Sequence, residues 1–260
     1  MKFVVTLMLT VSAINVKAEK IAKVCTLDSY PPFTFAIKGK DPNKTNELIK
    51  PGKDSKILQG FAWDVVKNSF HDQGYTVDLK IAPWARCMDL VKKGEIHAIF
   101  PASQNDERKK EFFFSSNYVD ETGYVVYTNK KTPVSWKGLP SLDGKVIHVM
   151  RGWSYGKDFE KYNGFQKKNV LNDSIVGALK MLKHNRIEYL IGYDIAFDYE
   201  IKKLQMNSHL VKSPSFGTAR EYLMGQKNTK DIKKILKVFD TGRKAIESKG
   251  IYKSIQAKWN

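Results

Sequence analysis

The chain has 260 residues, of which 42% are hydrophobic and 12% aromatic, and it contains no long low-complexity tract. This composition excludes a disordered chain and suits one large domain or two small ones. The formal charge of +17 suggests nucleic acid at first. However, the basic residues alternate with acidic ones over the whole length and no recognition motif accompanies them, so no nucleic-acid partner is predicted. The positive charge then indicates a solvated basic surface, or else an anionic partner such as a membrane surface or an acidic ligand.

The first eighteen residues have the pattern of a cleaved secretory signal: Lys2, an apolar run over 3–16, and a small-residue end at Ala18. The run is too short and too interrupted by polar residues to span a bilayer comfortably. Cleavage near Ala18 also removes Lys2 and Lys17, which leaves a charge of about +15. We therefore expect a soluble periplasmic or secreted protein. Lys23 precedes Cys25 closely, which argues against a lipid-anchored cysteine.

The chain has two cysteines, Cys25 and Cys87, which allow a single intramolecular pair. An exported protein meets an oxidising compartment, so a disulfide is predicted, with two buried free thiols as the alternative. The five histidines are scattered without the spacing of a metal-ligand cluster, and no metal site is expected.

From Glu19 onward, strand and helix patterns alternate. A short apolar strand over 21–27 is followed by Pro31 and Pro32, which interrupt regular structure. The polar stretch 38–57 indicates an exposed loop or hairpin. The remaining predictions in this half are a helix over 61–74, a strand over 75–82, a helix from Pro83 to Gly94, and the strand "IHAIF". This β-α-β-α-β order predicts a mostly parallel sheet with helices on both faces.

A second α/β unit of the same kind follows. Its predicted elements are a strand "GYVVYT", a buried strand over 144–150, a helix that begins within "RGWSYGKDF", an amphipathic helix over 174–186, and a strand over 187–193. A last strand "EYLMG", a long helix within "TKDIKKILKVFDTGRKAIESKG" and a short final helix end the chain.

Several of these landmarks, in this order, resemble the extracellular solute-binding proteins of the polar amino acid class that serve ABC importers. They are "YPPF", "GFAWD", "PWARCMDLVKKGEIHAIF", "ERKKEFFFSSNY", "GKVIHVMRGWSYG", "ALKMLKHNRIEYLIGYD" and "KGIYKSIQAKW". The resemblance implies the two-lobed type II periplasmic binding protein fold, which closes on a ligand as a Venus flytrap does. Lobe 1 would hold 19–119 and 222–260, and lobe 2 would hold 120–221, with two crossover strands between them and no cofactor. The paired "PWARC" and strand-one cysteines also support the Cys25 to Cys87 bridge.

By this resemblance, Arg108 grips the carboxylate of the ligand. A guanidinium forms two parallel charge-assisted hydrogen bonds to a carboxylate, which a lysine cannot do. The helix expected at Gly152, Trp153, Ser154 and Tyr155 would hold the other end of an anion, with Ser154 as a plain N-cap in the alternative interpretation. Considered without the family, Arg108 is better explained as a surface residue in a charged turn.

The resemblance implies further ligand contacts. Asp194 would accept the ligand ammonium, although it can equally cap the following helix, and Asp198 is a fallback. Tyr30 and Trp84, opposite Trp153, would form aromatic walls, or else pack within their own loops. Gln104 lies in "PASQND", where many members carry serine and threonine, so the ligand is left open.

Three functions are compatible with these residues. The first is a monomeric periplasmic binding protein that captures a small amino acid or related carboxylate and delivers it to an ABC permease. The second is a dehydratase-like enzyme on the same fold, which needs a general acid in the cleft, and no residue stands out for that role. The third is a ligand-sensing partner of a separate receptor. The first is expected, without enzymatic activity.

Overall fold

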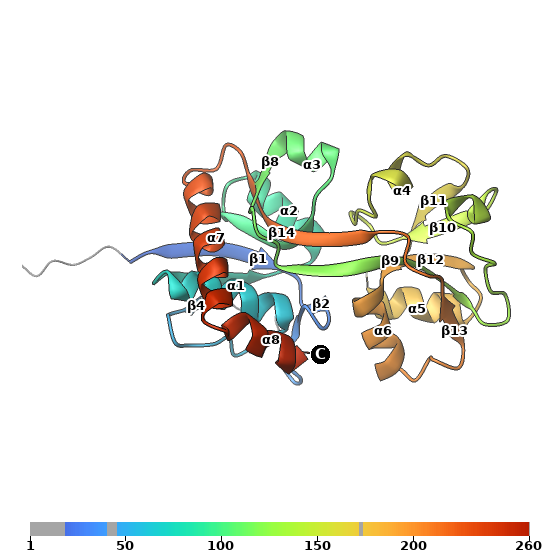
Figure 1. Ribbon diagram of the computed structural model, residues 1–260, viewed down its shortest axis with the longest axis horizontal. Helices are drawn as coiled ribbons and strands as arrows, with labels where there is room; N and C mark the ends of the chain where they lie inside the picture. The colour runs from blue at the N-terminus through green and yellow to red at the C-terminus, as the bar shows by residue number, and fades with distance from the viewer. Residues whose placement is uncertain (1–18, 41–45, 172–173, 260) are drawn as a thin grey trace, which may run out of the picture.

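The structure, a computed structural model, describes residues 19–40, 46–171 and 174–259. Within these residues, two groups of helices and strands lie side by side and are joined by two long strands (Figure 1). The joining strands are β9 (Asp120–Asn129) and β14 (Thr218–Gln226). The predicted signal segment, residues 1–18, lies outside the described residues.

Lobe 1 is built on β1 (Ile21–Thr26), which pairs in parallel with β6 (Thr76–Ile81) and β7 (Ala98–Ser103). An edge strand, β4 (Glu47–Ile49), pairs antiparallel with β6. The lobe contains helices α1 (Phe61–Asp72), α2 (Trp84–Lys92), α7 (Ile232–Ser248) and α8 (Ile251–Trp259). Helices α1 and α7 approach so closely that a Cβ atom at Gly242 would lie 1.9 Å from the Ser69 carbonyl oxygen, so only glycine fits there.

Lobe 2 repeats the pattern on a smaller scale. Strand β10 (Val146–Val149) pairs in parallel with β11 (Gln166–Asn169) and with β12 (Tyr189–Tyr193). Helix α5 (Ile175–Lys183) begins after Ser174, whose side chain accepts a hydrogen bond from the Gly177 N–H and so caps the helix. Helix α6 (Asp194–Lys203) follows β12 directly, and α4 (Lys157–Lys161) is a short helix after β10.

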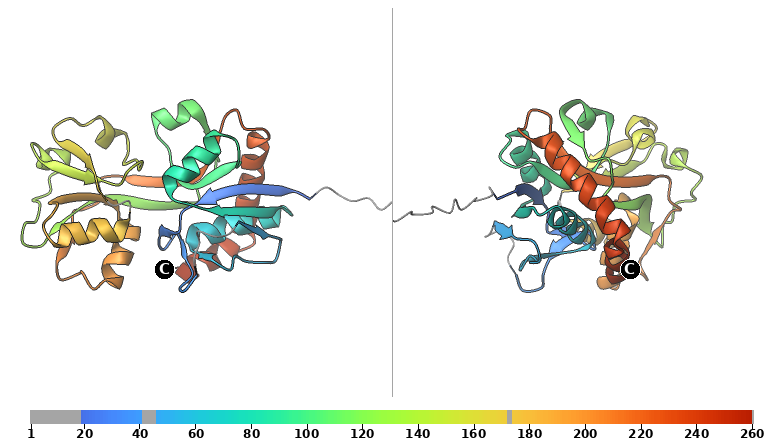
Figure 2. Two further views of the ribbon diagram at one scale, coloured as in Figure 1. Left: turned by 180° about the vertical axis from the view of Figure 1, so that it is seen from behind. Right: turned by 60° about the vertical axis from the view of Figure 1, so that its left-hand side comes forward.

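Strands β9 and β14 connect the two lobes. They pair antiparallel, with Glu221 opposite Asp120. Toward lobe 2, β9 pairs with β12, and toward lobe 1, β14 pairs with β7. One sheet in the order β11-β10-β12-β9-β14-β7-β1-β6-β4 therefore runs through the molecule, and it can be followed from behind in Figure 2 (left). The predicted lobe boundaries fall on β9 and β14, where the facing surfaces of the two lobes meet.

Several short elements complete the chain. They are β2 (Ser29–Tyr30), β3 (Thr34–Ala36), β5 (Leu58–Gln59), α3 (Asp106–Glu111), β8 (Phe112–Phe114), the 3-10 helix η2 (Leu139–Leu142) and β13 (Leu210–Lys212). The first three form a small separate sheet, β8 pairs with β14, and β13 pairs with β9.

The predicted α/β fold with its mostly parallel sheets is confirmed, and so are the helices expected over 61–74, after Pro83 and over 174–186. The helix expected at Gly152 to Tyr155 was placed too early, because α4 begins only at Lys157. Gly152 and Gly156 both have positive φ angles, of 73° and 86°, which hold this segment in a turn instead. Part of the polar stretch 38–57 forms β4, and 41–45 lies outside the described residues.

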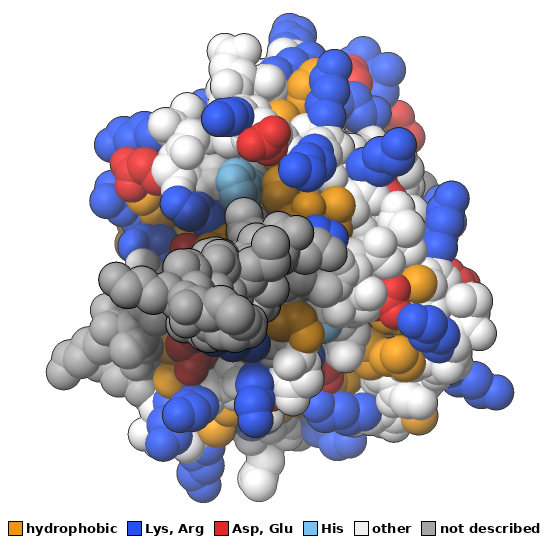
Figure 3. All heavy atoms as spheres, turned by 90° about the vertical axis from the view of Figure 1, so that its left-hand side faces the viewer, with side chains coloured by type: hydrophobic (Ala, Val, Ile, Leu, Met, Phe, Trp, Pro, Cys, Tyr) orange, Lys and Arg blue, Asp and Glu red, His pale blue; other side chains and the backbone are white. Residues whose placement is uncertain are grey.

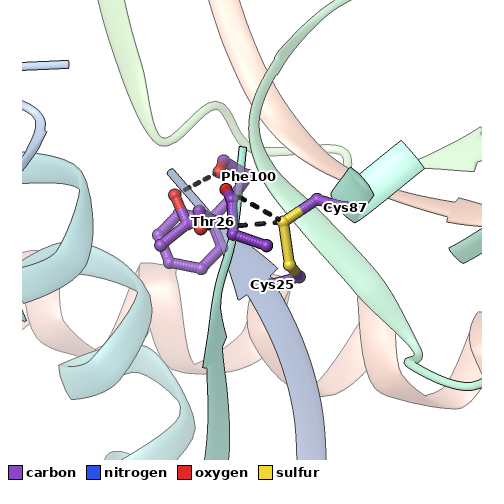
Figure 4. Close-up of a disulfide and its surroundings, with 5 residues drawn as sticks. Cys25, Thr26, Cys87 and Phe100 are labelled. Carbon is purple, nitrogen blue, oxygen red and sulfur yellow. Dashed lines mark hydrogen bonds between the residues drawn. A yellow bond between two sulfur atoms is a disulfide. The ribbon is translucent and has the colours of Figure 1, made fainter. Parts of the chain in front are cut away.

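The predicted disulfide is confirmed. Cys25 in β1 and Cys87 in α2 are bonded, with their Cα atoms 5.6 Å apart, and both residues are fully buried (Figure 4). Beside the disulfide, the Thr26 hydroxyl donates a 2.6 Å hydrogen bond to the Phe100 carbonyl oxygen, which connects β1 to β7. The disulfide fixes the helix that carries Trp84 to the central strand of lobe 1.

The charged surface matches the interleaved sequence pattern. Figure 3 shows lysine and arginine side chains spread over one end of lobe 1, with aspartate and glutamate among them. Within the described residues, no helix combines the length and the apolar character that crossing a membrane requires.

Candidate ligand-binding cleft between the lobes

Arg108 is held at the junction of the two lobes. The Asn105 side chain caps α3 by accepting a 2.7 Å hydrogen bond from the Arg108 backbone N–H. In the side chain, Nη1 donates to the Ser103 carbonyl oxygen at 2.6 Å and to its hydroxyl at 3.0 Å, and Nη2 donates to the Gly152 carbonyl oxygen of lobe 2 at 2.7 Å. The guanidinium also lies 5.8 Å from the centre of the Trp84 ring, within cation–π range.

A small cavity lies beside this guanidinium and is lined from both lobes. Its volume is about 20 Å³, close to the space of one water molecule. Apart from Arg108, its lining consists of aromatic, small and apolar residues with one carboxyl group: Leu27, Tyr30, Trp84, Pro101, Ser103, Gly152, Trp153, Tyr193 and Glu221.

Trp153 accounts for the small size of this cavity. The centre of its ring lies 5.2 Å from that of Tyr30 of lobe 1, in an edge-on arrangement, and 4.9 Å from that of Tyr193 of lobe 2, in a tilted one. Tyr193 is fixed in turn, because its hydroxyl donates a 2.6 Å hydrogen bond to the Ser154 carbonyl oxygen. A ligand larger than water therefore requires the indole to move or the lobes to separate.

On the other side of Arg108, the cleft opens into a wider groove of about 470 Å³. Trp84, Arg108, Gly152 and Trp153 line both the groove and the small cavity. The guanidinium thus borders both a wide groove and a small aromatic cavity, which is a suitable place to receive a small anion.

Glu221 supplies the carboxyl group of the cavity. The Tyr30 hydroxyl donates a 2.7 Å hydrogen bond to its Oε2 atom, and the side chain faces Asp120 across the paired strands. Burial raises the pKa of Glu221 to about 7, although the hydrogen bond from Tyr30 and the charge of Arg108 lower it. Burial, together with Glu221, raises the pKa of Asp120 well above its usual value.

Burial lowers the pKa of Arg108, and Tyr193 and Glu221 oppose this effect. An arginine nevertheless stays protonated at any physiological pH. The cleft therefore contains a permanent positive charge and a carboxyl group that changes charge close to neutral pH. No three His, Cys, Asp or Glu side chains gather as a metal site among the residues that the structure describes.

The predicted site residues do not all line the same cavity. Tyr30, Trp84, Arg108 and Trp153 line the small cavity together. Gln104 lines a different, polar cavity near Glu121 and Arg220. The ligand contacts assigned to all of them remain predictions.

Ser154 and Asp194 do not line this cavity. Ser154 is buried, and its hydroxyl has no hydrogen-bond partner among the described residues. The Asp194 carboxylate accepts hydrogen bonds from the Thr122 hydroxyl and from the backbone N–H groups of Gly123 and Ile195. This carboxylate fixes the start of α6 against β9, although Asp194 is the first residue of the helix and Tyr193 occupies the N-cap position.

Sequence reasoning missed Tyr193, Ser103 and Glu221 as lining residues. Tyr193 directly precedes Asp194, so it is the neighbouring position in the register that the sequence left open. Glu221 lies within "AREYL", where the alternation of β14 places it on the same face as Leu223, pointing inward. That alternation was the available signal for a buried acid on a crossover strand.

The comparisons with known proteins decide the family. The model of the bacterial extracellular solute-binding proteins, family 3, matches residues 22–260. This chain belongs to that family. Among curated proteins, the membrane-bound lytic murein transglycosylase F of Pseudomonas fluorescens (strain Pf0-1) is 28% identical over 138 residues. That match covers 50% of this chain and only 28% of the relative, so the family member described here corresponds to a fraction of that protein.

Solved structures share the fold at low identity. An ancestral arginine-binding protein bound to arginine has a TM-score of 0.74 at 20% identity, over 94% of this chain and 99% of the other. A histidine kinase sensor domain with similarity to periplasmic binding proteins has a TM-score of 0.74 at 17% identity, over 93% and 96%. An ancestral amino acid-binding protein, a precursor of cyclohexadienyl dehydratase, has a TM-score of 0.70 at 18% identity, over 92% and 95%. These likenesses confirm the two-lobed binding-protein fold.

Proposed function

We propose that this protein is a periplasmic substrate-binding protein that captures a small amino acid or related carboxylate for an ABC importer, and that it is not an enzyme. The observation that carries the proposal is the position of Arg108. Its guanidinium lies between the lobes, contacts both of them, and borders both the small cavity and the wide groove. The extracellular family and the disulfide agree with an oxidising compartment outside the cytoplasm.

The proposed capture step follows from the present bonds of Arg108. Nη2 donates to the Gly152 carbonyl oxygen, a neutral acceptor. A ligand carboxylate is a stronger acceptor and fits the planar guanidinium with two parallel bonds. When the ligand carboxylate replaces the Gly152 carbonyl oxygen as the acceptor, the two lobes stay in contact through the ligand. The ligand thereby favours the closed arrangement, which a permease would then recognise on a monomeric protein.

The test is calorimetry with Arg108→Met after the protein has been unfolded and refolded to remove carried-over ligand. The panel contains the standard amino acids and small organic acids. We expect at least one compound to bind the wild type and to lose about 100-fold or more in affinity in the variant, because two charge-assisted hydrogen bonds disappear.

Arg86 offers the matched control, since it lies on α2 and is exposed. Arg86→Met should bind as the wild type does. Equal affinity in the Arg108 variant, or no binding of any compound to the wild type, contradicts the proposal.

One observation favours a second candidate, a dehydratase-like enzyme. Glu221 is a buried acid with a pKa raised to about 7, in the same cavity as Arg108. Arg108 would hold a carboxylate of the substrate, and Glu221 would protonate the leaving hydroxyl group, which departs as water while the ring carboxylate of prephenate departs as CO₂ and its bonding electrons complete the aromatic ring. Incubation with prephenate tests this candidate. Turnover that disappears in Glu221→Gln supports it, and unchanged prephenate at high protein concentration rejects it.

A further inference from the structure

The two spaces that border the Arg108 guanidinium differ greatly in volume. The small cavity measures about 20 Å³, because Trp153 packs there on Tyr30 and Tyr193. The groove measures about 470 Å³, a volume typical of small-molecule sites. Arg108 and Gly152 line the groove as well, so a carboxylate can reach the guanidinium from the groove while Trp153 keeps its place. The rest of such a ligand then lies in the groove.

The groove offers an apolar wall next to the guanidinium. On α2 this wall consists of Trp84, Ala85 and Met88, and Trp153 lines the groove from lobe 2. The centre of the Trp84 ring lies 5.8 Å from the guanidinium carbon, so the wall begins directly beside the positive charge. Trp84 and Met88 are half-buried and Ala85 is exposed. A ligand group placed on this wall therefore removes apolar surface from water.

The acidic side chains of the groove are poor partners for a ligand ammonium group. Among the described residues that line the groove they are Asp89, Glu107, Glu111 and Glu160, and all four are exposed. Glu111 is already paired with Lys92 at 3.2 Å. Water screens an exposed carboxylate, so its attraction for a cation is weak. An ammonium group covered by a ligand would lose hydration there without a buried partner, whereas an amide nitrogen carries no charge.

We propose that the cleft binds N-acylated amino acids, that is, carboxylates whose α-nitrogen belongs to an amide bond. Arg108 holds the carboxylate, and the acyl group lies on the α2 wall of the groove. The Gly152 carbonyl oxygen, which loses the Arg108 Nη2 donor when the carboxylate binds, accepts the amide N–H of the ligand in exchange. This inference rests on the proposed function, because it defines the class of carboxylate that Arg108 receives. The same chemistry occurs in free N-acyl amino acids and at the carboxyl terminus of a peptide.

The experiment compares probes that share one side chain and differ at their two ends: L-leucine, N-acetyl-L-leucine, N-acetyl-L-leucine amide and glycylglycyl-L-leucine. Analogous sets for L-alanine, L-phenylalanine and L-lysine cover other side chains. In calorimetry with the refolded protein, we expect the N-acetyl compound of at least one set to bind about tenfold or more tightly than the free amino acid. The amide, which lacks the carboxylate, should bind about 100-fold or more weakly than the N-acetyl compound. A peptide that binds more than about tenfold tighter than the N-acetyl compound identifies a peptide terminus as the ligand, and a smaller ratio identifies a free N-acyl amino acid.

Ala85→Trp tests the position of the acyl group. Ala85 is exposed and lines the groove, so a larger side chain there narrows the groove without disturbing the core. It should lower the affinity of the N-acetyl compound about tenfold or more and change that of the free amino acid less than about threefold. Arg86→Trp adds the same side chain at the next exposed position, which is not among the described residues that line the groove, and should bind as the wild type does. Thermal unfolding confirms that each variant is folded.

The outcomes separate the two proposals. If the N-acetyl compound of every set fails to exceed the free amino acid by about tenfold in affinity, this inference is overturned. The proposed function then stands as long as the binding needs Arg108. An unchanged affinity of the N-acetyl compound in Ala85→Trp overturns the placement of the acyl group in the groove. Absence of binding by every probe overturns both proposals.

Discussion

Two aspartates at the start of β9 differ in their hydrogen-bond partners. Asp120 belongs to β9 itself, and Asp194 contacts β9 from the start of α6. The Oδ1 atom of Asp194 accepts hydrogen bonds of 2.8 Å from the Thr122 hydroxyl, 2.9 Å from the Gly123 N–H and 2.7 Å from the Ile195 N–H. Asp120, two residues before Thr122, is more deeply buried and receives no such donor among the described residues. The two aspartates therefore differ both in burial and in the hydrogen-bond donors around them.

This difference also distinguishes a carboxyl group that stabilises the fold from one that can respond to a bound cation. A carboxylate that accepts several hydrogen bonds is stable as an anion and holds its element in place. A carboxyl group with an acidic neighbour and few donors keeps a proton, and it gains most when a cation arrives. Asp194 has three such donors, whereas Asp120 has none among the described residues and lies opposite Glu221.

The largest expected effect concerns pH and stability. The pKa of Glu221 is raised to about 7 in the folded protein, while an unfolded glutamate titrates near ~4.3. The folded state therefore binds more protons between these values, and its stability decreases as the pH rises through them. The full shift corresponds to about 4 kcal/mol of stability, of which about 2.6 kcal/mol is lost between pH 5 and pH 8. Urea unfolding at pH 5 and pH 8 should show this loss in the wild type and a smaller loss in Glu221→Gln. Parallel pH profiles for the two proteins contradict a raised pKa of Glu221 in the folded protein.

Asp194→Ala is the next largest change. It removes the acceptor for three donors and leaves two backbone N–H groups without their partner, so we expect a loss of about 2 kcal/mol in the free energy of unfolding. Asp194→Asn keeps an oxygen acceptor and should recover much of that loss. Ligand affinity measured well below the melting temperature should change less than threefold. A tenfold loss of affinity with unchanged stability would return Asp194 to the role that the sequence assigned to it.

The contrast explains why the sequence located one end of the ligand site better than the other. Arg108 follows the capping residue Asn105 by three positions, so local rules alone place its side chain at the start of a short helix. The repeated β-α pattern likewise determines most elements and the parallel pairing. Even there, Gly152 and Gly156 delay α4 to Lys157.

The approach of the two buried acids Asp120 and Glu221 depends on long-range pairing that local patterns do not contain. Asp120 and Glu221 are about one hundred positions apart in the chain, and they meet because β9 and β14 pair in one particular register. A shift of one residue would turn Glu221 to the opposite face of the strand. The choice between Tyr193 and Asp194 is the same kind of problem, since one position decides which side chain enters the cavity.

The smallest expected effect concerns the Tyr30 hydroxyl, which donates a hydrogen bond to Glu221. Tyr30→Phe removes the hydroxyl that donates to Glu221 Oε2 at 2.7 Å and leaves the ring that packs on Trp153. We expect a loss of about 1 kcal/mol. Because the hydroxyl stabilises the ionised form of Glu221, the loss should be larger at pH 8 than at pH 5. In a Glu221→Gln background this pH dependence should disappear, since the side chain no longer ionises. A pH-independent loss in both backgrounds would mean that Tyr30 acts only through packing, and the charge of Glu221 would then depend on Asp120 and Arg108 alone.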